Sequence, residues 1–315
     1  MQNPYKRPVL YVLAFFFLTL AVFAQEERKE TLINMQTIPL DGVETLTITC
    51  RDDVLVLLES QNGKVVLKEY RDESQKQDKT QSVNTLSYTT VDNSVLGITV
   101  RTTTRTVPFQ SNGYTEVYIP PSFLGSFKFT AESSVIRSEV NLNSGREVNI
   151  TVTNGDLDLK QVSAERINIT MSAGSFRAER LVGAEINMRH SAGPIEIGEV
   201  AGLLSLEALS GPIKVKELTG GGSVVTRAGT IDIVLRNAIE DFSCSLTNGN
   251  INIVIPQDLS YNLDAEAKSG TVMITPPGGT PFRVPGSIQW TFGDEAEITL
   301  SVKVSTGSIA IGPEK

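Results

Sequence analysis

One short phrase occurs four times between Ile167 and Ile233, in the forms Ser172-Ala173-Gly174-Ser175-Phe176, Ser191-Ala192-Gly193-Pro194-Ile195, Leu209-Ser210-Gly211-Pro212-Ile213 and Arg227-Ala228-Gly229-Thr230-Ile231. The glycine of the phrase steps forward by roughly 19 residues, a period typical of repeat architectures. One repeat of this size cannot bury an apolar face alone, so its core has to come from stacking against neighbouring repeats.

Apolar residues recur at fixed distances from this glycine. Side chains two positions apart on a strand share a face. The second and fourth positions after the glycine are apolar throughout: Leu157/Leu159, Phe176/Ala178, Ile195/Ile197, Ile213/Val215, Ile231/Ile233, Ile251/Ile253, Val272/Ile274 and Ile309/Ile311. The alternate positions before it are mostly apolar too, and Gly222/Val224/Thr226 is the weakest set. The pattern predicts an all-β, single-chain β-solenoid, parallel β-helix-like, of about eight rungs. Each glycine would take a tight corner that excludes a Cβ.

Two outward columns of this stack carry polar residues. In-register rungs lie about 4.8 Å apart, so equivalent residues become neighbours. The charged column contains Asp158, Arg177, Glu196, Lys214, Asp232 and Asn252, and the asparagine column contains Asn149, Asn168, Asn187, Ser205, Ser223 and Ser243. Arg189 is likewise expected to face Glu207. Because a slip of one rung would bring like charges together, we interpret these columns as specifying the register. A binding site on either face is the alternative.

The first 24 residues have the features of a signal peptide. Lys6 and Arg7 precede the apolar run Val9–Phe23, which is short for a membrane span, and Ala24 supplies the small residue expected before cleavage. The mature chain is then expected to begin at Gln25, and the protein to be exported to the periplasm or cell surface. An uncleaved membrane anchor is the alternative.

The mature chain divides into two predicted regions. Residues 25–121 alternate in the manner of antiparallel strands, with a hairpin expected at Asn62-Gly63. Residues 122–315 form the solenoid repeats, interrupted by a loop or cap insertion at 276–297. We expect this insertion, which contains Trp290, to cover the end of the solenoid, although an aromatic contact for a partner is the alternative. Leu300–Ile311 is then expected to form the last rung.

The net charge argues against nucleic acid as a partner, and the positions of the two cysteines bear on whether they form a disulfide. The formal net charge of -8 offers no basic face to nucleic acid. Cys50 and Cys244 both occupy apolar, strand-like positions. An exported chain permits a disulfide, but we expect two separate buried thiols that act as small hydrophobic side chains.

No catalytic, cofactor-binding or metal-binding set is predicted. The chain contains a single histidine, His190, so chemistry that needs two histidines of one chain is excluded. His190 falls in an inward column. Gly220-Gly221-Gly222 lacks the aspartate of a calcium-binding turn and the lysine of a phosphate loop. Asp156, Asp158 and Asp232 are the carboxylates considered for a polysaccharide-active lyase or hydrolase, but they form no dense acidic patch.

Several of these phrases resemble the bacterial DUF4097 (putative adhesin) family. They are Asn154-Gly155-Asp156-Leu157-Asp158-Leu159, Ser210-Gly211-Pro212-Ile213-Lys214-Val215, Val117-Tyr118-Ile119-Pro120-Pro121 and Ile253-Val254-Ile255-Pro256-Gln257-Asp258-Leu259. The resemblance spans roughly Thr37 to the C-terminus and is strongest over Asn149–Ile274. It implies an exported or envelope-associated β-strand repeat protein and supplies no catalytic motif.

These observations together predict a non-enzymatic, adhesin-like structural or binding module of the cell envelope. Its partner would be an envelope protein or a glycan, held by repeated faces rather than by one residue. Contact with the membrane would come through the targeting segment alone. A polysaccharide-active β-helix enzyme is the alternative function.

Overall fold

The computed structural model describes residues 30–72, 87–101, 113–293 and 296–314. Every element in these residues is a β-strand, and the strands belong to one 18-stranded sheet. Their bounds are β1 (Glu30–Ile38), β2 (Thr45–Arg51), β3 (Val54–Glu59), β4 (Val65–Asp72), β5 (Tyr88–Asp92), β6 (Val95–Arg101), β7 (Gly113–Ile119), β8 (Ser126–Glu132), β9 (Val135–Asn143), β10 (Glu147–Asn154), β11 (Leu157–Ser163), β12 (Arg166–Ala173), β13 (Phe176–Ala192), β14 (Ile195–Ser210), β15 (Ile213–Ile255), β16 (Tyr261–Ile274), β17 (Phe282–Phe292) and β18 (Ile298–Pro313). The predicted signal peptide lies outside the described residues.

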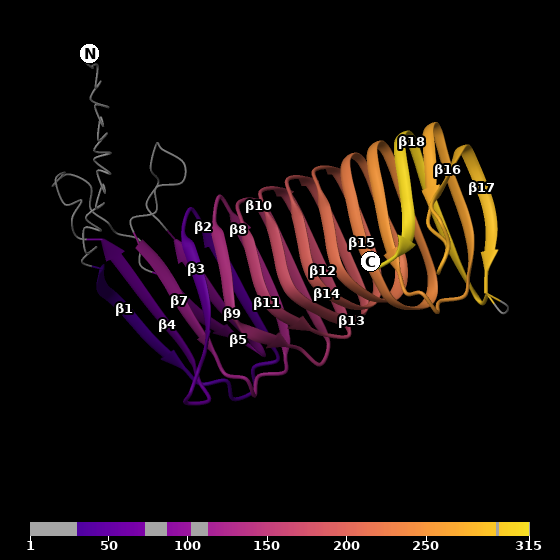
Figure 1. Ribbon diagram of the computed structural model, residues 1–315. Coiled ribbons are helices and arrows are strands. Elements are labelled where there is room, and N and C mark those ends of the chain that lie inside the picture. The colour runs from indigo at the N-terminus through magenta and orange to yellow at the C-terminus, as the bar shows by residue number, and fades with distance from the viewer. Residues whose placement is uncertain (1–29, 73–86, 102–112, 294–295, 315) are drawn as a thin grey trace, which may run out of the picture.

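Most strands pair in parallel with equivalent residues of the neighbouring coil. Phe176 of β13 pairs with Leu157 of β11 on one side and with Ile195 of β14 on the other. Ile195 pairs in turn with Ile213 of β15. The chain is therefore all-β with a largely parallel sheet, and Figure 1 shows its coils stacked in a row from the indigo N-terminal end to the yellow C-terminal end.

The inward columns expected from the repeat fill the core between the two walls of each coil. Val148, Ile167, Ile186 and Leu204 stack in one such column, and each is at most 1% exposed. In the weakest predicted set Val224 and Thr226 are buried, and Thr226 pairs with Ala208 in a column of inward side chains. Burial of these apolar side chains is the main force that holds one coil on the next.

The corner glycines occupy the positions that the repeat predicts. Gly193 and Gly211 have φ of 131° and 126°, a region that residues with a Cβ rarely adopt. A Cβ on Gly211 would overlap the carbonyl oxygen of Gly193, and one on Gly193 would overlap that of Gly174. The glycines thus stack directly on one another, and the prediction of a corner without a Cβ is confirmed.

The N-terminal strands form the expected antiparallel pairs only in part. β2 pairs in parallel with β6 and β8, and β3 pairs in parallel with β7 and β9, so these strands already belong to the parallel stack. Antiparallel pairs in this region are β1–β4, β4–β7 and β5–β6. The prediction was wrong for β2 and β3, because alternating apolar residues indicate a buried face and not the direction of the neighbouring strand.

The hairpin prediction at Asn62-Gly63 is also wrong. β4 pairs with β7 rather than with β3, because β7 lies between them and takes the edge of β3. The turn is held locally instead: the Ser60 hydroxyl oxygen lies 2.8 Å from Asn62 Oδ1 and 2.6 Å from the Lys64 carbonyl oxygen, and it donates its single proton to one of them.

The C-terminal coils are not stacked in chain order. β18 lies between β15 and β16, with Val302 pairing with Cys244 on one side and Ala265 on the other. The expectation that Leu300–Ile311 forms the last rung is therefore wrong. The segment 276–297 contains β17, which pairs antiparallel with β16 at the end of the stack (Figure 1).

Candidate functional site

The asparagine column forms a continuous ladder along one broad face of the stack. Asn168 Nδ2 donates to Asn149 Oδ1 at 2.8 Å, and Asn187 Nδ2 donates to Asn168 Oδ1 at 3.2 Å. Ser205 and Ser223 follow in the same register on β14 and β15. The residues are placed there because they alternate with buried apolar positions of the same strands, so the ladder faces outward as the sequence predicts.

The ladder leaves unused hydrogen-bonding capacity on its outer side. A primary amide has two N–H donors and two acceptor lone pairs, and the ladder takes one donor and one lone pair of Asn168. A shallow depression of about 410 Å³ lies over this part of the face. Thr170, Arg189 and Glu207 border it, and the Arg189 guanidinium pairs with Glu207 at 3.2 Å, as expected from the sequence. The face therefore offers neutral polar groups to an extended ligand.

The charged column lies on the strands that follow the corner glycines, and its central residue, Glu196, is paired with two cations. Arg177 and Glu196 are adjacent, with Nε and Oε2 4.0 Å apart. Glu196 makes its shorter ion pair with Lys216 at 2.7 Å, although Lys214 is its neighbour in register. The hydrogen bond from Lys216 lowers the pKa of Glu196. These exposed pairs are each worth little in stability but fix which coil lies beside which.

Asp156, one of the carboxylates considered for catalysis, links two coils. Asp156 Oδ1 accepts hydrogen bonds from the Ser175 backbone N–H at 2.8 Å and from its hydroxyl at 2.6 Å. These bonds lower the pKa of Asp156, which keeps it ionised and unsuited to donate a proton. Asp158 lies between Arg137 and Arg177 in the sheet. The structure thus gives Asp156 a structural use, places Asp158 beside two arginines and does not bring either aspartate together with Asp232.

His190 lies in the core at 1% exposure, as its column predicts. Its Nε2 is 3.0 Å from the carbonyl oxygen of Gly174, and within the described part of the chain Nδ1 has no hydrogen-bond partner. Burial lowers the pKa of this imidazole. The same described residues contain no cluster of three or more His, Cys, Asp or Glu side chains arranged to hold a metal ion.

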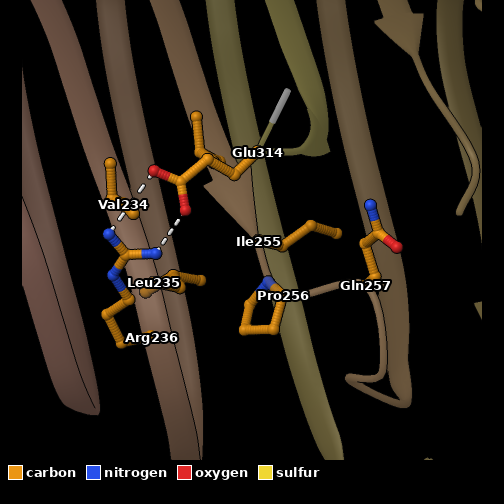
Figure 2. Close-up of a pocket in the computed structure, with 8 residues that line it drawn as sticks. Val234, Leu235, Arg236, Ile255, Pro256, Gln257 and Glu314 are labelled. Carbon is orange, nitrogen blue, oxygen red and sulfur yellow. Dashed lines mark hydrogen bonds and ion pairs between the residues drawn. The ribbon is translucent and has the colours of Figure 1, made fainter.

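A second depression, of about 430 Å³, lies beside the C-terminal end of β18 (Figure 2). Arg236 reaches across it to form an ion pair with Glu314, and its Nη2 lies 3.4 Å from Glu217 Oε1. Sequence reasoning missed this pair, since Glu314 comes near Arg236 only through the position of β18 beside β15. The ion pair joins Glu314 to Arg236 of β15 and occupies the depression, so we do not assign a binding site there.

A buried charged cluster near β3, β4 and β7 was also missed. Arg71 Nη2 lies 3.2 Å from Asp53 Oδ2 and also pairs with Glu69, while Thr115 Oγ1 donates to Asp53 at 3.1 Å. The signal in the sequence is that Glu69 and Arg71 continue the inward alternation of Leu67. Removing one partner of such a network strongly destabilises the fold, because it leaves a buried charge without its neutralising contact.

The two cysteines are separate and buried, which confirms the predicted thiols. Burial raises the pKa of Cys50 to about 12 and raises that of Cys244 further, so both are held as unreactive thiols. Across the described ranges, no helix is long and apolar enough to cross a membrane.

Comparisons with known proteins bear on most of the chain. A family model described as Toastrack DUF4097 matches residues 43–312. A search of curated proteins gave no match. Similar solved structures are a putative cell adhesion protein from Clostridium sporogenes (9% identity, TM-score 0.29, covering 91% of this chain and 99% of that chain), a putative adhesin from Bacteroides fragilis (12%, 0.36, 89% and 97%) and a putative adhesin from Parabacteroides merdae (10%, 0.28, 90% and 96%). The residues that match the family model include both polar columns.

Proposed function

This chain belongs to the Toastrack DUF4097 family, and on that premise we propose that it is an exported, non-enzymatic, adhesin-like binding module of the cell envelope. In this proposal the chain is a β-solenoid of roughly 19-residue repeats, an architecture whose stacked faces suit an extended partner. The signal peptide of residues 1–24 delivers it to the periplasm or cell surface, and this targeting segment supplies its contact with the membrane.

The observation that carries the proposal is the asparagine column. Asn149, Asn168 and Asn187 hold one another in line, so their free amide groups are presented at the fixed spacing of the coils. Preorganised donors and acceptors lose little entropy on binding. A neutral, hydroxyl- or amide-rich chain, such as a glycan or an extended segment of an envelope protein, matches this chemistry.

The charged column is less suited to this role. Arg177, Glu196 and Lys216 already satisfy one another, and a ligand would have to break those contacts. The proposal therefore assigns binding to the asparagine face and register to the charged face.

Site-specific photocrosslinking in cells tests this assignment. A photoreactive amino acid replaces Thr170 on the asparagine face or, as the matched control, exposed Lys160 of β11, and the captured material is identified. We expect one envelope protein or one polysaccharide from position 170, and much less capture when Asn168→Ala and Asn187→Ala are added. Equal capture from both faces, or no envelope component from position 170, would refute the proposal. Shortened polysaccharide would instead support a lyase or hydrolase.

A further inference from the structure

The C-terminal end of the stack presents a strand edge without a neighbour. β17 pairs antiparallel with β16, whose other edge is taken by β18. β18 is itself enclosed by β15 and β16, so among the described strands β17 has one free edge. Figure 1 shows β17 at the far end of the row of coils. Its outer N–H and C=O groups are available to another strand.

The inner face of this last strand is apolar and incompletely covered. Trp290 is 50% exposed although its partner in the sheet, Leu263, is 3% exposed. The Trp290 ring stacks on Phe292 with centroids 5.8 Å apart and lies 5.7 Å from Phe282. In the body of the stack such positions are buried by the next coil, so the end coil lacks a cover.

The charge on the free edge of β17 limits which partner strand can pair with it. Arg283 is the single charged residue among the 11 residues of β17, and the outward positions Ser287, Gln289 and Thr291 are neutral. Natural edge strands often carry charges or proline residues that prevent pairing. Pro285 has no backbone N–H, but it lies outside residues 286–292, which carry no charge. A charged partner would find only Arg283 here and no charge on the outward positions Ser287, Gln289 and Thr291, whereas a second β17 offers the same neutral backbone edge and the same apolar row. Two copies of this net-negative chain also repel least at their neutral ends.

We propose that β17 is the interface through which two copies of this chain join end to end. The two β17 strands pair antiparallel about a two-fold axis near Gln289, which places Ser287 of one copy opposite Thr291 of the other. Ile288 and Trp290 lie on one face of the strand, so the pairing also brings the two apolar rows together. The contact uses both free edges at once and is closed, as expected of an isologous dimer. It does not depend on the proposed function.

A charge-exchange experiment on the full mature chain, residues 25–315, tests the interface by sedimentation velocity. The wild type is expected to form dimers. Ser287→Lys with Thr291→Lys places lysine opposite lysine and is expected to weaken dimerisation at least about tenfold. Ser287→Glu with Thr291→Glu does the same, and an equimolar mixture of the two variants restores a dimer of one lysine copy and one glutamate copy.

The matched control is Thr153→Lys with Thr230→Lys, which adds the same charge at exposed positions of the stack body and leaves the dimer intact. Circular dichroism melting of each variant shows that it is folded, and restoration in the mixture requires folded partners. A monomeric wild type, dimers that persist in the lysine variant, or a mixture that stays monomeric would overturn the proposal. Filaments dissolved by Met35→Lys in β1 would also overturn it, because they would show head-to-tail joining.

Discussion

Asn250 accepts two hydrogen bonds from Ser308, a residue 58 positions further along the chain. Its Oδ1 lies 3.1 Å from the Ser308 backbone nitrogen and 2.8 Å from its hydroxyl. The same arrangement joins Asp156 to Ser175 in consecutive coils, 19 positions apart. Each of these residues directly follows a corner glycine, so the coil of Gly307 takes the place next to that of Gly249.

Engineered disulfides test this order of coils. Ser243 pairs with Ser301, and Ser301 pairs with Asp264 on its other side. Adjacent strands bring Cα atoms to about 4.8 Å, within the range of a disulfide, whereas strands two apart are about 9.6 Å away. In a chain carrying Cys50→Ala and Cys244→Ala, Ser243→Cys with Ser301→Cys is expected to oxidise. Ser243→Cys with Asp264→Cys is the control and is expected to remain reduced.

Peptide mapping by mass spectrometry without reductant gives the result. A crosslink between positions 243 and 264 in place of one between 243 and 301 would show that the coils stack in chain order and that β18 is terminal.

The coil architecture could be predicted because the repeat reports it directly. Columns such as Ile167, Ile186 and Leu204 follow from the spacing of apolar residues, and the glycine corner follows from the recurring phrase. The ladder of Asn149, Asn168 and Asn187 follows as well, since in-register stacking makes equivalent residues neighbours.

The order of the last coils could not be predicted, for a physical reason. Cys244, Val302 and Ala265 occupy equivalent inward positions. The hydrophobic effect is non-directional, so the packing of apolar side chains does not select which coil becomes the neighbour. A similar ambiguity hid the inward face of β3. Residues 54–58 are all apolar, so alternation does not select a face, and the structure buries Leu55 and Leu57 while Val54, Val56 and Leu58 stay half-buried.

Gly211→Ala is expected to destabilise the fold by about 3 kcal/mol, at the upper end of the usual range for point mutations. The new Cβ would overlap the carbonyl oxygen of Gly193 and would occupy a φ of 126°. Gly278→Ala is the control, because that glycine also has a positive φ but has open space at its Cβ; we expect a loss of about 1 kcal/mol. Urea unfolding measures both, and equal losses would show that backbone conformation rather than stacking sets the requirement for glycine.

Asp158→Arg is expected to destabilise the stack by about 0.2–1 kcal/mol for each like-charged neighbour. Asp158 pairs with Arg137 and Arg177, so the variant aligns three positive charges. Adding Arg177→Asp is expected to recover part of the loss. A double-mutant cycle by urea unfolding measures the coupling, and additive effects would mean that positions 158 and 177 do not interact across the coils.

Thr226→Val is expected to stabilise the protein by about 1 kcal/mol. The Thr226 side chain is 1% exposed, and its Oγ1 has no hydrogen-bond partner among the described residues. Valine keeps the shape and removes the cost of burying an unpaired hydroxyl. Thr170→Val on the exposed face of β12 is the control and is expected to change stability by less than about 0.5 kcal/mol. A lower urea midpoint for Thr226→Val would show that the hydroxyl is satisfied in solution.

Stability is expected to fall as the pH drops from about 7 to 5, because of His190. Burial lowers the pKa of His190 in the folded state below the 6.5 of the unfolded chain. Between those two values the unfolded chain binds a proton that the folded chain excludes, so acid favours unfolding. The contribution of one histidine cannot exceed about 1.4 kcal/mol per pH unit, and no second histidine is present.

His190→Met provides the test, since methionine already occupies the adjacent position 171 of the same inward column. Urea unfolding from pH 7 to 5 is expected to show the fall in the wild type and a flatter profile in the variant, with the difference confined to the window below pH 6.5 and above the folded-state pKa. Met188→Leu is the control for a change of core shape, and it keeps the wild-type pH dependence. If His190→Met lost stability with acid as steeply as the wild type, the protonation of another group would have to be responsible, and His190 would be charged without penalty in the folded chain.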